Sequence, residues 1–380
     1  MKQPKLRFPE FTGDWKQHKF EDVVTIGSGK DYKHLESGNV PVYGTGGYML
    51  SVNQALSESE DAVGIGRKGT IDKPYILRAP FWTVDTLFYC IPNEGFDLTF
   101  TNCLFQNVDW KKKDESTGVP SLSKVIISNV KTYVPSLEEQ QKIASLFTEL
   151  DSLIQSAEKE LEGYRELKQG MLQKMFPKKG EKVPEIRFPE FTGDWEQLKL
   201  SEVSDVRDGT HDSPSYQNEG HPFVTSKNVK DGYINYDDIQ YISDEDFNNI
   251  NKRSKVDIND ILMGMIGTIG NLALIRTEPD FAIKNVALIK DTKQISYLYL
   301  YYYLQSPSTE NQLLSGLDGG TQKFISLKKI RELNVSIPSE SEQLKIGEYF
   351  QNLDSLIASQ QQELDGYKEL KKGLLQQMFC

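Results

Sequence analysis

The sequence has few cysteines and histidines. Its three cysteines, Cys90, Cys103 and Cys380, form no C-x-x-C pair and no even set, which argues against a disulfide framework or a zinc site. The four histidines are too scattered to suggest another metal site. The first residues have no apolar core, and the longest mostly apolar stretch, 261–275, is interrupted by glycines and is too short to span a bilayer. We therefore expect a cytoplasmic protein without a bound metal.

Motifs for catalysis are also missing. There is no G-x-x-x-x-G-K-[ST] phosphate loop, no H-E-x-x-H, and no Asn-Pro-Pro-aromatic or Asp-Pro-Pro-aromatic tetrapeptide, which an amino-methyltransferase would use. The stretch GIGRKG at 64–69 does match G-x-G-x-x-G. However, Pro74 follows closely, and Gly69 to Asp72 has the composition of a turn rather than of a helix start. We interpret this stretch as a turn between strands, and we predict no catalytic residue and no cofactor for this chain.

A basic excess is the third absence. The chain has 44 Lys and Arg against 55 Asp and Glu, a net charge of −11 at pH 7. Proteins that hold nucleic acid by its phosphates normally carry a basic excess. A chain of this composition is therefore expected to bind DNA poorly by itself.

What the sequence does contain is a repeat. The phrase RFPEFTGDW occupies 7–15 and returns at 187–195, and the segment 139–176 matches 342–379. Between phrase and matching segment lie two inserts, 17–136 and 199–339, which are not repeats of each other in sequence. Such an internal repeat indicates that one structural unit is used twice. The frame is duplicated and the inserts are not.

The repeated segments predict two long helices. Ser136 with Glu139, and Ser339 with Glu342, each form an S-x-x-E capping box just after a proline. Apolar residues then recur every three or four positions, which is the heptad pattern of helices packed side by side. These seam residues are Phe147, Leu150, Ile154, Leu161 and Tyr164 in the first helix, and Phe350, Leu353, Ile357, Leu364 and Tyr367 in the second. We predict that the helices pair with each other in an antiparallel coiled coil; the alternative is that each packs on its own insert.

The inserts contain short β-rich runs punctuated by glycine, and 295–305 predicts a helix. The predicted fold class is therefore α+β, with two mixed α/β domains separated by two long antiparallel coiled-coil helices and an internal pseudo-twofold repeat. The predicted division is an arm at 1–16, a first domain at 17–136, a helix at 137–177, a linker and second arm at 178–198, a second domain at 199–339 and a helix at 340–380.

Polar and basic side chains gather on glycine-containing loops of both inserts. Donors of this kind can hold phosphates or base edges, although for any single residue an ordinary solvated loop is the alternative. The candidate DNA contacts are Thr45, Arg67, Lys68, Thr70, Lys73, Ser121 and Lys124 in the first insert, and Thr210, His211, Ser226, Lys227, Asn228, Thr268, Asn271, Lys284, Thr321, Gln322 and Lys323 in the second.

The repeated phrase is interpreted as part of the frame. Pro9 disfavours a helix, and Phe8, Phe11 and Trp15 offer apolar anchors, so we expect an extended arm that packs near a helix end. The alternative is that these aromatic rings stack on bases. We disfavour it because the phrase is identical before two inserts that differ in sequence, and such unlike inserts would hardly share identical contact residues.

The duplicated helices, the repeated phrase and the DGTHDSP stretch at 208–214 together resemble the specificity subunit of a type I restriction–modification system, over essentially the whole chain. The resemblance implies that each insert recognises one half of a split, asymmetric site in double-stranded DNA. It implies that the helices set the spacer and dock two modification (methyltransferase) subunits, through which restriction subunits join. S-adenosylmethionine, ATP and magnesium then belong to the partner subunits, and the chain itself is non-catalytic and has no membrane partner.

Two other readings stay open from the sequence alone. The chain could be a stand-alone DNA methyltransferase or nuclease, although the missing motifs argue against an enzyme. It could also be a coiled-coil scaffold that only holds proteins together, although two large and unlike inserts are hard to explain in that case.

Overall fold

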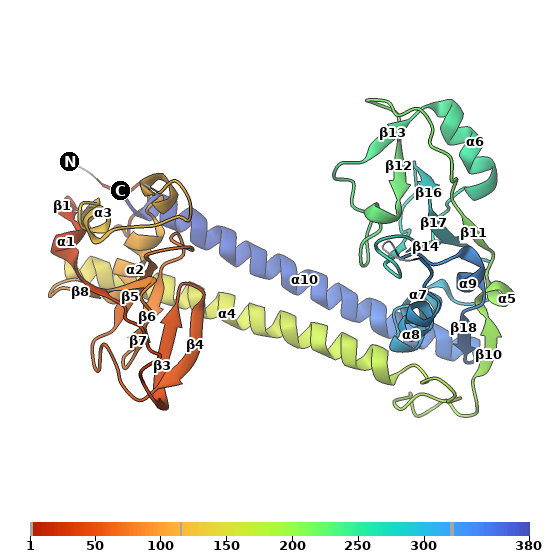
Figure 1. Ribbon diagram of the computed structural model, residues 1–380, viewed down its shortest axis with the longest axis horizontal. Coiled ribbons are helices and arrows are strands. Elements are labelled where there is room, and N and C mark those ends of the chain that lie inside the picture. The colour runs from red at the N-terminus through yellow and green to blue at the C-terminus, as the bar shows by residue number, and fades with distance from the viewer. Residues whose placement is uncertain (1–2, 115, 320–322) are drawn as a thin grey trace. The chain divides into compact units, whose positions relative to one another are not determined.

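The computed structural model describes residues 3–114, 116–319 and 323–380 (Figure 1). The predicted contacts Thr321 and Gln322 lie outside the described residues. The chain forms two compact units. Unit 1 comprises Met1–Lys159 and Gln360–Cys380, and unit 2 comprises Glu160–Ser359. Each unit therefore contains one domain, the beginning or end of the first long helix, and the complementary part of the second.

The first domain contains three small sheets. One is two-stranded (β1-β9), one is four-stranded and antiparallel (β2-β8-β5-β6), and one is three-stranded (β4-β3-β7) with a parallel β3–β7 pair. The strands are β1 (Lys16–Lys19), β2 (Val24–Ser28), β3 (Ser37–Gly44), β4 (Gly47–Val52), β5 (Ala62–Gly66), β6 (Tyr75–Leu77), β7 (Trp82–Thr83), β8 (Leu87–Pro92) and β9 (Lys131–Val134). The helices are α1 (Phe20–Val23), α2 (Leu98–Gln106), η1 (Trp110–Lys113) and α3 (Lys124–Ser128).

The second domain has the same topology. Its sheets are β10-β18, the antiparallel β11-β17-β14-β15, and β13-β12-β16 with a parallel β12–β16 pair. The strands are β10 (Glu196–Lys199), β11 (Val206–Asp208), β12 (His221–Thr225), β13 (Gln240–Ile242), β14 (Ile261–Gly264), β15 (Leu272–Leu274), β16 (Ala282–Lys284), β17 (Val286–Ile289) and β18 (Asn334–Ile337). The helices are α5 (Leu200–Val203), η2 (Ser226–Asn228), α6 (Asp244–Ser254), α7 (Tyr297–Tyr303), α8 (Pro307–Ser315) and α9 (Leu327–Arg331).

The repeat therefore extends through the inserts, although their sequences do not show it. The clearest marker is a glycine after β2 and after β11. A Cβ on Gly29 would lie 1.9 Å from the carbonyl oxygen of Val84, and a Cβ on Gly209 would lie 2.3 Å from that of Ile283. Only glycine permits this close backbone approach. The domains differ mainly by insertion: α6 separates β13 from β14, whereas the described residues between β4 and β5 contain no helix.

The repeated segments form α4 (Leu137–Lys174) and α10 (Glu340–Met378). In unit 1, Asp151 pairs with Lys371 at 2.5 Å and Glu158 with Lys368 at 2.7 Å. Residue numbers therefore rise along α4 while they fall along α10. In unit 2, Lys168 pairs with Asp354 at 2.7 Å, and Phe176 stacks on Phe350 at 5.7 Å between ring centroids. The helices are therefore antiparallel in each unit. None of the helices among the described residues is long and apolar enough to cross a membrane.

The seam positions of the helices differ in burial. Phe147, Leu150, Leu161, Phe350, Leu353 and Leu364 are buried, whereas Ile154, Tyr164, Ile357 and Tyr367 are half-buried.

The repeated Met-Phe at the end of each long helix completes the core of a domain. Phe379 stacks on Phe100 at 5.3 Å between ring centroids and lies 6.2 Å from the ring of Trp15. In unit 2, the Phe176 ring packs against the rings of Tyr299 and Tyr303, with 5.8 and 5.5 Å between ring centroids. Both phenylalanines are buried. Each domain core therefore includes aromatic side chains from the end of the helix that belongs to the other repeat, which explains why these two letters are repeated.

The repeated phrase binds the glutamate of the predicted capping box. In unit 1, Arg7 donates from Nε to Glu139 Oε1 at 2.7 Å and from Nη2 to Oε2 at 2.8 Å, and the Trp15 indole donates to Oε1 at 3.2 Å. Arg187 binds Glu342 with the same two distances in unit 2. The Glu139 and Glu342 side chains are only 2% and 1% exposed. We call each of these the Arg–Glu pair.

The capping-box prediction is thus half right. The backbone N–H of Glu139 donates to Ser136 Oγ at 3.4 Å, and that of Glu342 to Ser339 Oγ at 3.4 Å. The carboxylates, however, accept from arginine rather than reach back to the helix start. A bidentate charge-assisted pair is stronger than a single bond to a backbone N–H, which accounts for the difference. The hydrogen bond to Glu139 raises the pKa of Arg7, and the bond to Glu342 raises that of Arg187, so both cations are held charged.

Removing one partner of the buried pair tests this arrangement. We expect Glu139→Gln to destabilise unit 1 by about 3–5 kcal/mol, because it leaves the largely buried Arg7 guanidinium without a counter-charge. The matched control is Glu21→Gln, which removes the exposed partner of Lys19 and should cost at most about 1 kcal/mol. Hydrogen exchange at the α2 amides, measured on the full chain, reports the stability of unit 1. Equal effects of the two substitutions would contradict the assigned role.

Candidate nucleic-acid interface

Five chain segments meet along one edge of the first domain, which we call the first loop edge: 29–36, 45–46, 67–70, 84–86 and 119–123. Backbone hydrogen bonds hold these segments to one another or to the adjoining ends of β3, β7 and β8. These bonds are Gly29 N to Leu87 O (3.1 Å), Lys30 N to Thr83 O (2.8 Å), Val84 N to Tyr43 O (3.0 Å), Arg67 N to Thr86 O (2.8 Å), Gly69 N to Pro120 O (2.8 Å) and Leu122 N to Arg67 O (2.9 Å). The loops that connect the strands of the four-stranded and three-stranded sheets therefore lie along a common edge.

The second domain builds the same edge, the second loop edge, from 209–214, 226–228, 265–271, 285 and 323–325. The corresponding bonds are Gly209 N to Val286 O (3.0 Å), Thr210 N to Ile283 O (3.0 Å) and Ile325 N to Met265 O (3.0 Å). Gly66 and Gly264 each begin the turn after the central strand, and a Cβ on either would meet the carbonyl oxygen of the threonine four residues on. This equivalence confirms that GIGRKG is a turn between β5 and β6 and opens no helix.

The first loop edge contains five of the predicted contacts, and backbone pairing brings three of them, Arg67, Lys68 and Ser121, directly together. Arg67 and Lys68 are exposed directly after β5, and Lys68 forms a β-bridge with Ser121. The Arg67 guanidinium donates to the backbone oxygen of Asp85 at 3.4 Å and lies 5.9 Å from the Phe88 ring centroid. The Arg67 side chain therefore contacts Asp85 and Phe88 on one side, while the residue as a whole remains exposed.

The remaining predicted contacts of the first domain are less uniform. Thr45 is half-buried at the tip of the β3–β4 hairpin, and Thr70 is half-buried in the glycine turn. Lys73 is exposed beyond that turn. Lys124 is exposed at the start of α3, but its ammonium group donates to the backbone oxygen of Ile26 at 2.8 Å.

Several predicted contacts in the second domain use their polar groups inside the fold. Ser226 Oγ accepts from Met265 N at 3.0 Å and Ile266 N at 3.3 Å and also bonds to the backbone oxygen of Asn285. The Thr268 hydroxyl bonds to the backbone oxygen of Ser226. Two amide side chains act in the same way, Asn228 bonding Thr225 and Asn235, and Asn271 bonding Val229. These groups hold the turns of the second loop edge in place.

His211 lies between two acceptors. Its Nδ1 is 2.7 Å from Asn285 Oδ1, and its Nε2 is 2.9 Å from Asp208 Oδ2. Only the protonated imidazolium donates from both nitrogens. The bond to Asn285, with that to Asp208, accordingly raises the pKa of His211. Asp208 also pairs with Arg253 of α6. Thr210 is half-buried beside this group, and Lys284 bonds the hydroxyl of Ser213.

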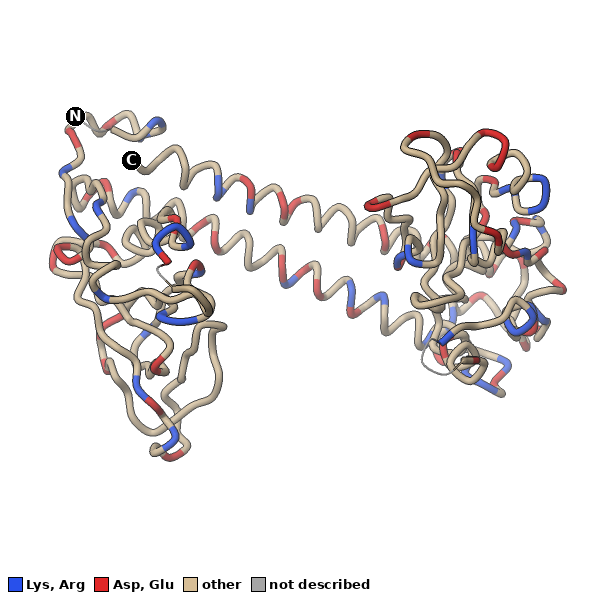
Figure 2. Tube along the Cα trace, turned by 45° about the horizontal axis from the view of Figure 1, so that its top comes forward, with Lys and Arg blue, Asp and Glu red and all other residues tan. Residues whose placement is uncertain are grey.

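Two predicted lysines of the second domain are simply exposed. Lys227 projects from η2, and Lys323 precedes the bridge between Phe324 and Ile266. Figure 2 shows that Lys and Arg positions are interspersed with Asp and Glu positions along the trace of both domains.

Sequence reasoning missed Lys30 and Lys33. The hydrogen bonds above align Gly29 and Lys30 with Gly209 and Thr210, so the loop 29–34 of the first domain is the counterpart of the DGTHDSP loop of the second. Both lysines are exposed. The only shared letter at this point is the glycine, which is too weak a signal to be found without the structure.

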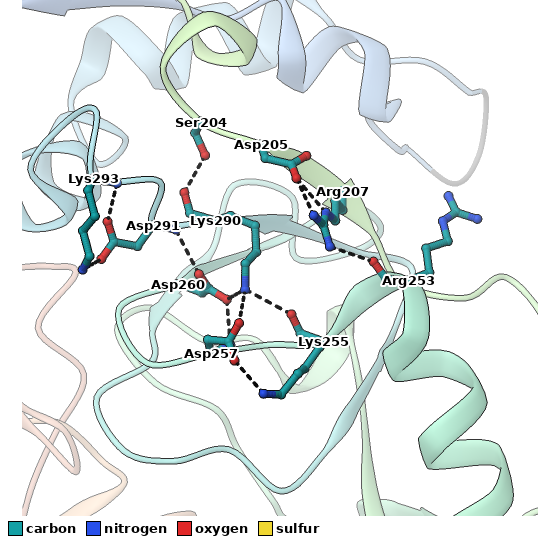
Figure 3. Close-up of polar contacts among 10 residues, drawn as sticks. All are labelled: Ser204, Asp205, Arg207, Arg253, Lys255, Asp257, Asp260, Lys290, Asp291 and Lys293. Atoms are coloured by element: carbon teal, nitrogen blue, oxygen red, sulfur yellow. Dashed lines mark hydrogen bonds and ion pairs between the residues drawn. The ribbon is translucent and has the colours of Figure 1, made fainter.

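A partly buried charged cluster lies in the second domain at the other end of β17 from the second loop edge (Figure 3). The Lys290 ammonium group contacts Asp260 at 2.5 Å and Asp257 at 2.6 Å, and the backbone N–H of Asp291 donates to Asp260 at 2.9 Å. The bond to Lys290 lowers the pKa of Asp257. Every charged partner here is satisfied internally, so the cluster anchors β17 to the loop before β14. Within the described residues, no group of His, Cys, Asp and Glu is placed to hold a metal ion.

Two neighbouring residues separate scaffold from surface. We expect Ser226→Ala to lower the stability of unit 2 by about 1–3 kcal/mol, because two backbone N–H groups lose their acceptor. Lys227→Ala should change it by no more than about 0.5 kcal/mol, since the side chain is exposed. Thermal unfolding of the two variants measures the difference. A larger loss for Lys227→Ala would show that the burial pattern of η2 has been misassigned.

The pKa of His211 predicts a pH dependence. Because its folded-state pKa lies above the unfolded value, its contribution to stability is fully present below about pH 6.5 and is lost as the pH rises through the folded-state pKa. The difference in urea midpoint between the wild type and His211→Gln should therefore shrink from pH 5.5 to pH 8.5. A difference that grows over this range would contradict the assigned hydrogen bonds.

Comparison with known proteins gives a consistent result. The family of type I restriction modification DNA specificity domains matches residues 12–163 and 192–366. The type I restriction enzyme MjaVIII specificity subunit of Methanocaldococcus jannaschii is 28% identical over 278 residues, which cover 70% of this chain and 65% of that protein. The chain thus spans a little under two thirds of that relative's length in the match.

Solved structures show the same fold. The S subunit of a type I restriction-modification system from M. genitalium superposes with a TM-score of 0.65 at 15% identity, covering 100% of this chain and 99% of the other. A chain from a structural study of complex assembly and conformational transition in a type I R-M system superposes with a TM-score of 0.56 at 17% identity, covering 96% and 97%. With the family match over both repeats, these likenesses place the chain in the type I restriction–modification specificity subunit family.

Proposed function

We propose that each domain recognises one half of a bipartite, asymmetric site in double-stranded DNA through its loop edge. The observation that carries this proposal is that one backbone framework, built twice, presents different side chains. Arg67 and Lys68 follow β5, whereas Met265 and Ile266 occupy the equivalent places after β14. Side chains in base contact specify sequence, while backbone contacts only position the protein. Two unlike edges on equivalent frames therefore suit two unlike half-sites.

We further propose that the long helices set the spacer between the half-sites and dock two methyltransferase subunits. A groove recurs beside the helices in each unit. In unit 1 its cavity volume is about 590 Å³, and its helix residues include Asp151, Ile154, Lys371 and Leu375. In unit 2 it is about 640 Å³, and the helix residues at the matching repeat positions are Asp354, Ile357, Lys168 and Leu172. The domain residues that complete the grooves differ. Equal helix surfaces support two copies of one partner.

The chemistry of modification and cleavage is then assigned to the partners. S-adenosylmethionine, ATP and magnesium would be bound by methyltransferase subunits and by the restriction subunits that join through them, and this chain supplies specificity without catalysis. The net charge of −11 supports a further part of the proposal, namely that the isolated chain binds DNA poorly and that flanking subunits contribute much of the phosphate contact.

Mapping methylated sites in cells that carry the complex tests the proposal. We expect a split site with two different halves. The double variant Arg67→Ala/Lys68→Ala should relax or weaken recognition of one half only, because both side chains belong to the first loop edge. Loss of both halves together, with the complex no longer assembled, would indicate misfolding instead. Methyl transfer to DNA by the purified chain alone would contradict the non-catalytic assignment, and an assembled complex without sequence preference would favour a scaffold.

A further inference from the structure

Four exposed cations line the first loop edge: Lys30, Lys33, Arg67 and Lys68. Among the described residues, no carboxylate forms an ion pair with any of them, in contrast to Lys19, Arg78, Lys111 and Lys112 of the same domain. Asp31 lies between Lys30 and Lys33 in the sequence, and its carboxylate accepts from the backbone N–H of Lys33 at 3.2 Å. In a chain with a large acidic excess, cations left without counter-ions at one edge are available to an external anion.

Their spacing is fixed by the sheet. β2 and β5 both pair with β8, so the chains that leave these strands at Gly29 and Arg67 are separated by two strand spacings, about 10 Å. The loop after β2 is held in place because the Trp82 indole donates to the backbone oxygen of Lys30 at 2.9 Å. Phosphates follow one another at about 3.4 Å along the axis of each DNA strand, so a row of this length faces several phosphates.

The second domain lacks cations at all four equivalent positions. Thr210 corresponds to Lys30 through the shared hydrogen-bond pattern, and Ser213 follows it as Lys33 follows Lys30. Met265 and Ile266 stand in place of Arg67 and Lys68. The second loop edge keeps Lys227 and Lys323, but at other positions. The two edges therefore share a backbone and differ in electrostatics.

We infer that the first loop edge is the electrostatic anchor of this chain on DNA. Lys30 and Lys33 contact the phosphodiester backbone at the first half-site, beside the Arg67 and Lys68 side chains proposed for base contact, whereas the second half-site is held with much less phosphate contact at the positions equivalent to the two lysines. This inference rests on the proposed function, because it assigns phosphate-binding residues within the proposed interface. It adds Lys30 and Lys33, which the sequence pattern did not mark.

The test is the salt dependence of binding by the assembled complex to a duplex that contains its mapped site. Each lost phosphate contact reduces the slope of log K against log salt by about 0.9. We expect Lys30→Ala/Lys33→Ala to reduce that slope by about 2 and to weaken binding about 30-fold at 0.15 M salt, with the difference vanishing toward 1 M. Discrimination against base changes in the second half-site should be unchanged.

The matched control is Lys16→Ala/Lys131→Ala, which removes the same charge from the β1–β9 sheet outside the loop edge. Its slope should equal that of the wild type. A converse variant, Thr210→Lys/Ser213→Lys, places the two lysines on the second loop edge and should increase the slope.

The possible failures are distinguishable. If the wild-type complex prefers its mapped site but Lys30→Ala/Lys33→Ala leaves the slope unchanged, or the control reduces it equally, the anchor is wrong and the proposed function stands. If the wild-type complex shows no preference for the mapped site over a shuffled duplex, the proposed function itself is contradicted, and the anchor falls with it.

Discussion

The structure depends on one buried interaction, the pair between an arginine of the repeated phrase and a glutamate in the first turn of each long helix. Arg7 and Arg187 each give two hydrogen bonds to a carboxylate that is almost fully buried. Burying a charge is costly unless it is paired and hydrogen-bonded, so phrase and helix must be retained together. This explains why the nine-residue phrase and the long helix are the two parts of the chain that repeat most closely.

The pair also fixes how a domain is mounted on its helix. The phrase runs into the first strand of the domain, and the last strand of the domain runs into the helix, so β1 and β9 pair beside the Arg–Glu pair, as β10 and β18 do in the second unit. The core is then completed by Phe379 in unit 1 and Phe176 in unit 2. Each domain is held at its base by repeated residues, and its loop edge is formed by residues that need not repeat.

Much of this organisation could be predicted from the sequence. The heptad positions, the glycine turn after β5 and the helix at α7 follow from local patterns whose physical basis is periodicity or backbone conformation. The equivalence of the two inserts could not be predicted, because it lies in strand order and backbone hydrogen bonds rather than in side chains. The same limit hid the relation between Lys30 and Thr210. Conversely, Ser226 and Asn228 were predicted as DNA contacts because polar residues in loops suggest exposure, whereas both are buried and bond the backbone. Likewise, the capping-box motif correctly predicted where the long helices begin. It could not predict that Glu139 would accept its hydrogen bonds from Arg7.

The central claim is that one frame carries two interchangeable recognition domains. It is tested most directly by replacing residues 17–136 with a second copy of 199–339 and mapping the DNA sites that the resulting complex methylates. We expect a symmetric site composed of two inverted copies of the half-site of the second domain. Retention of the original asymmetric site, or an assembled and active complex that methylates no defined site, would contradict it.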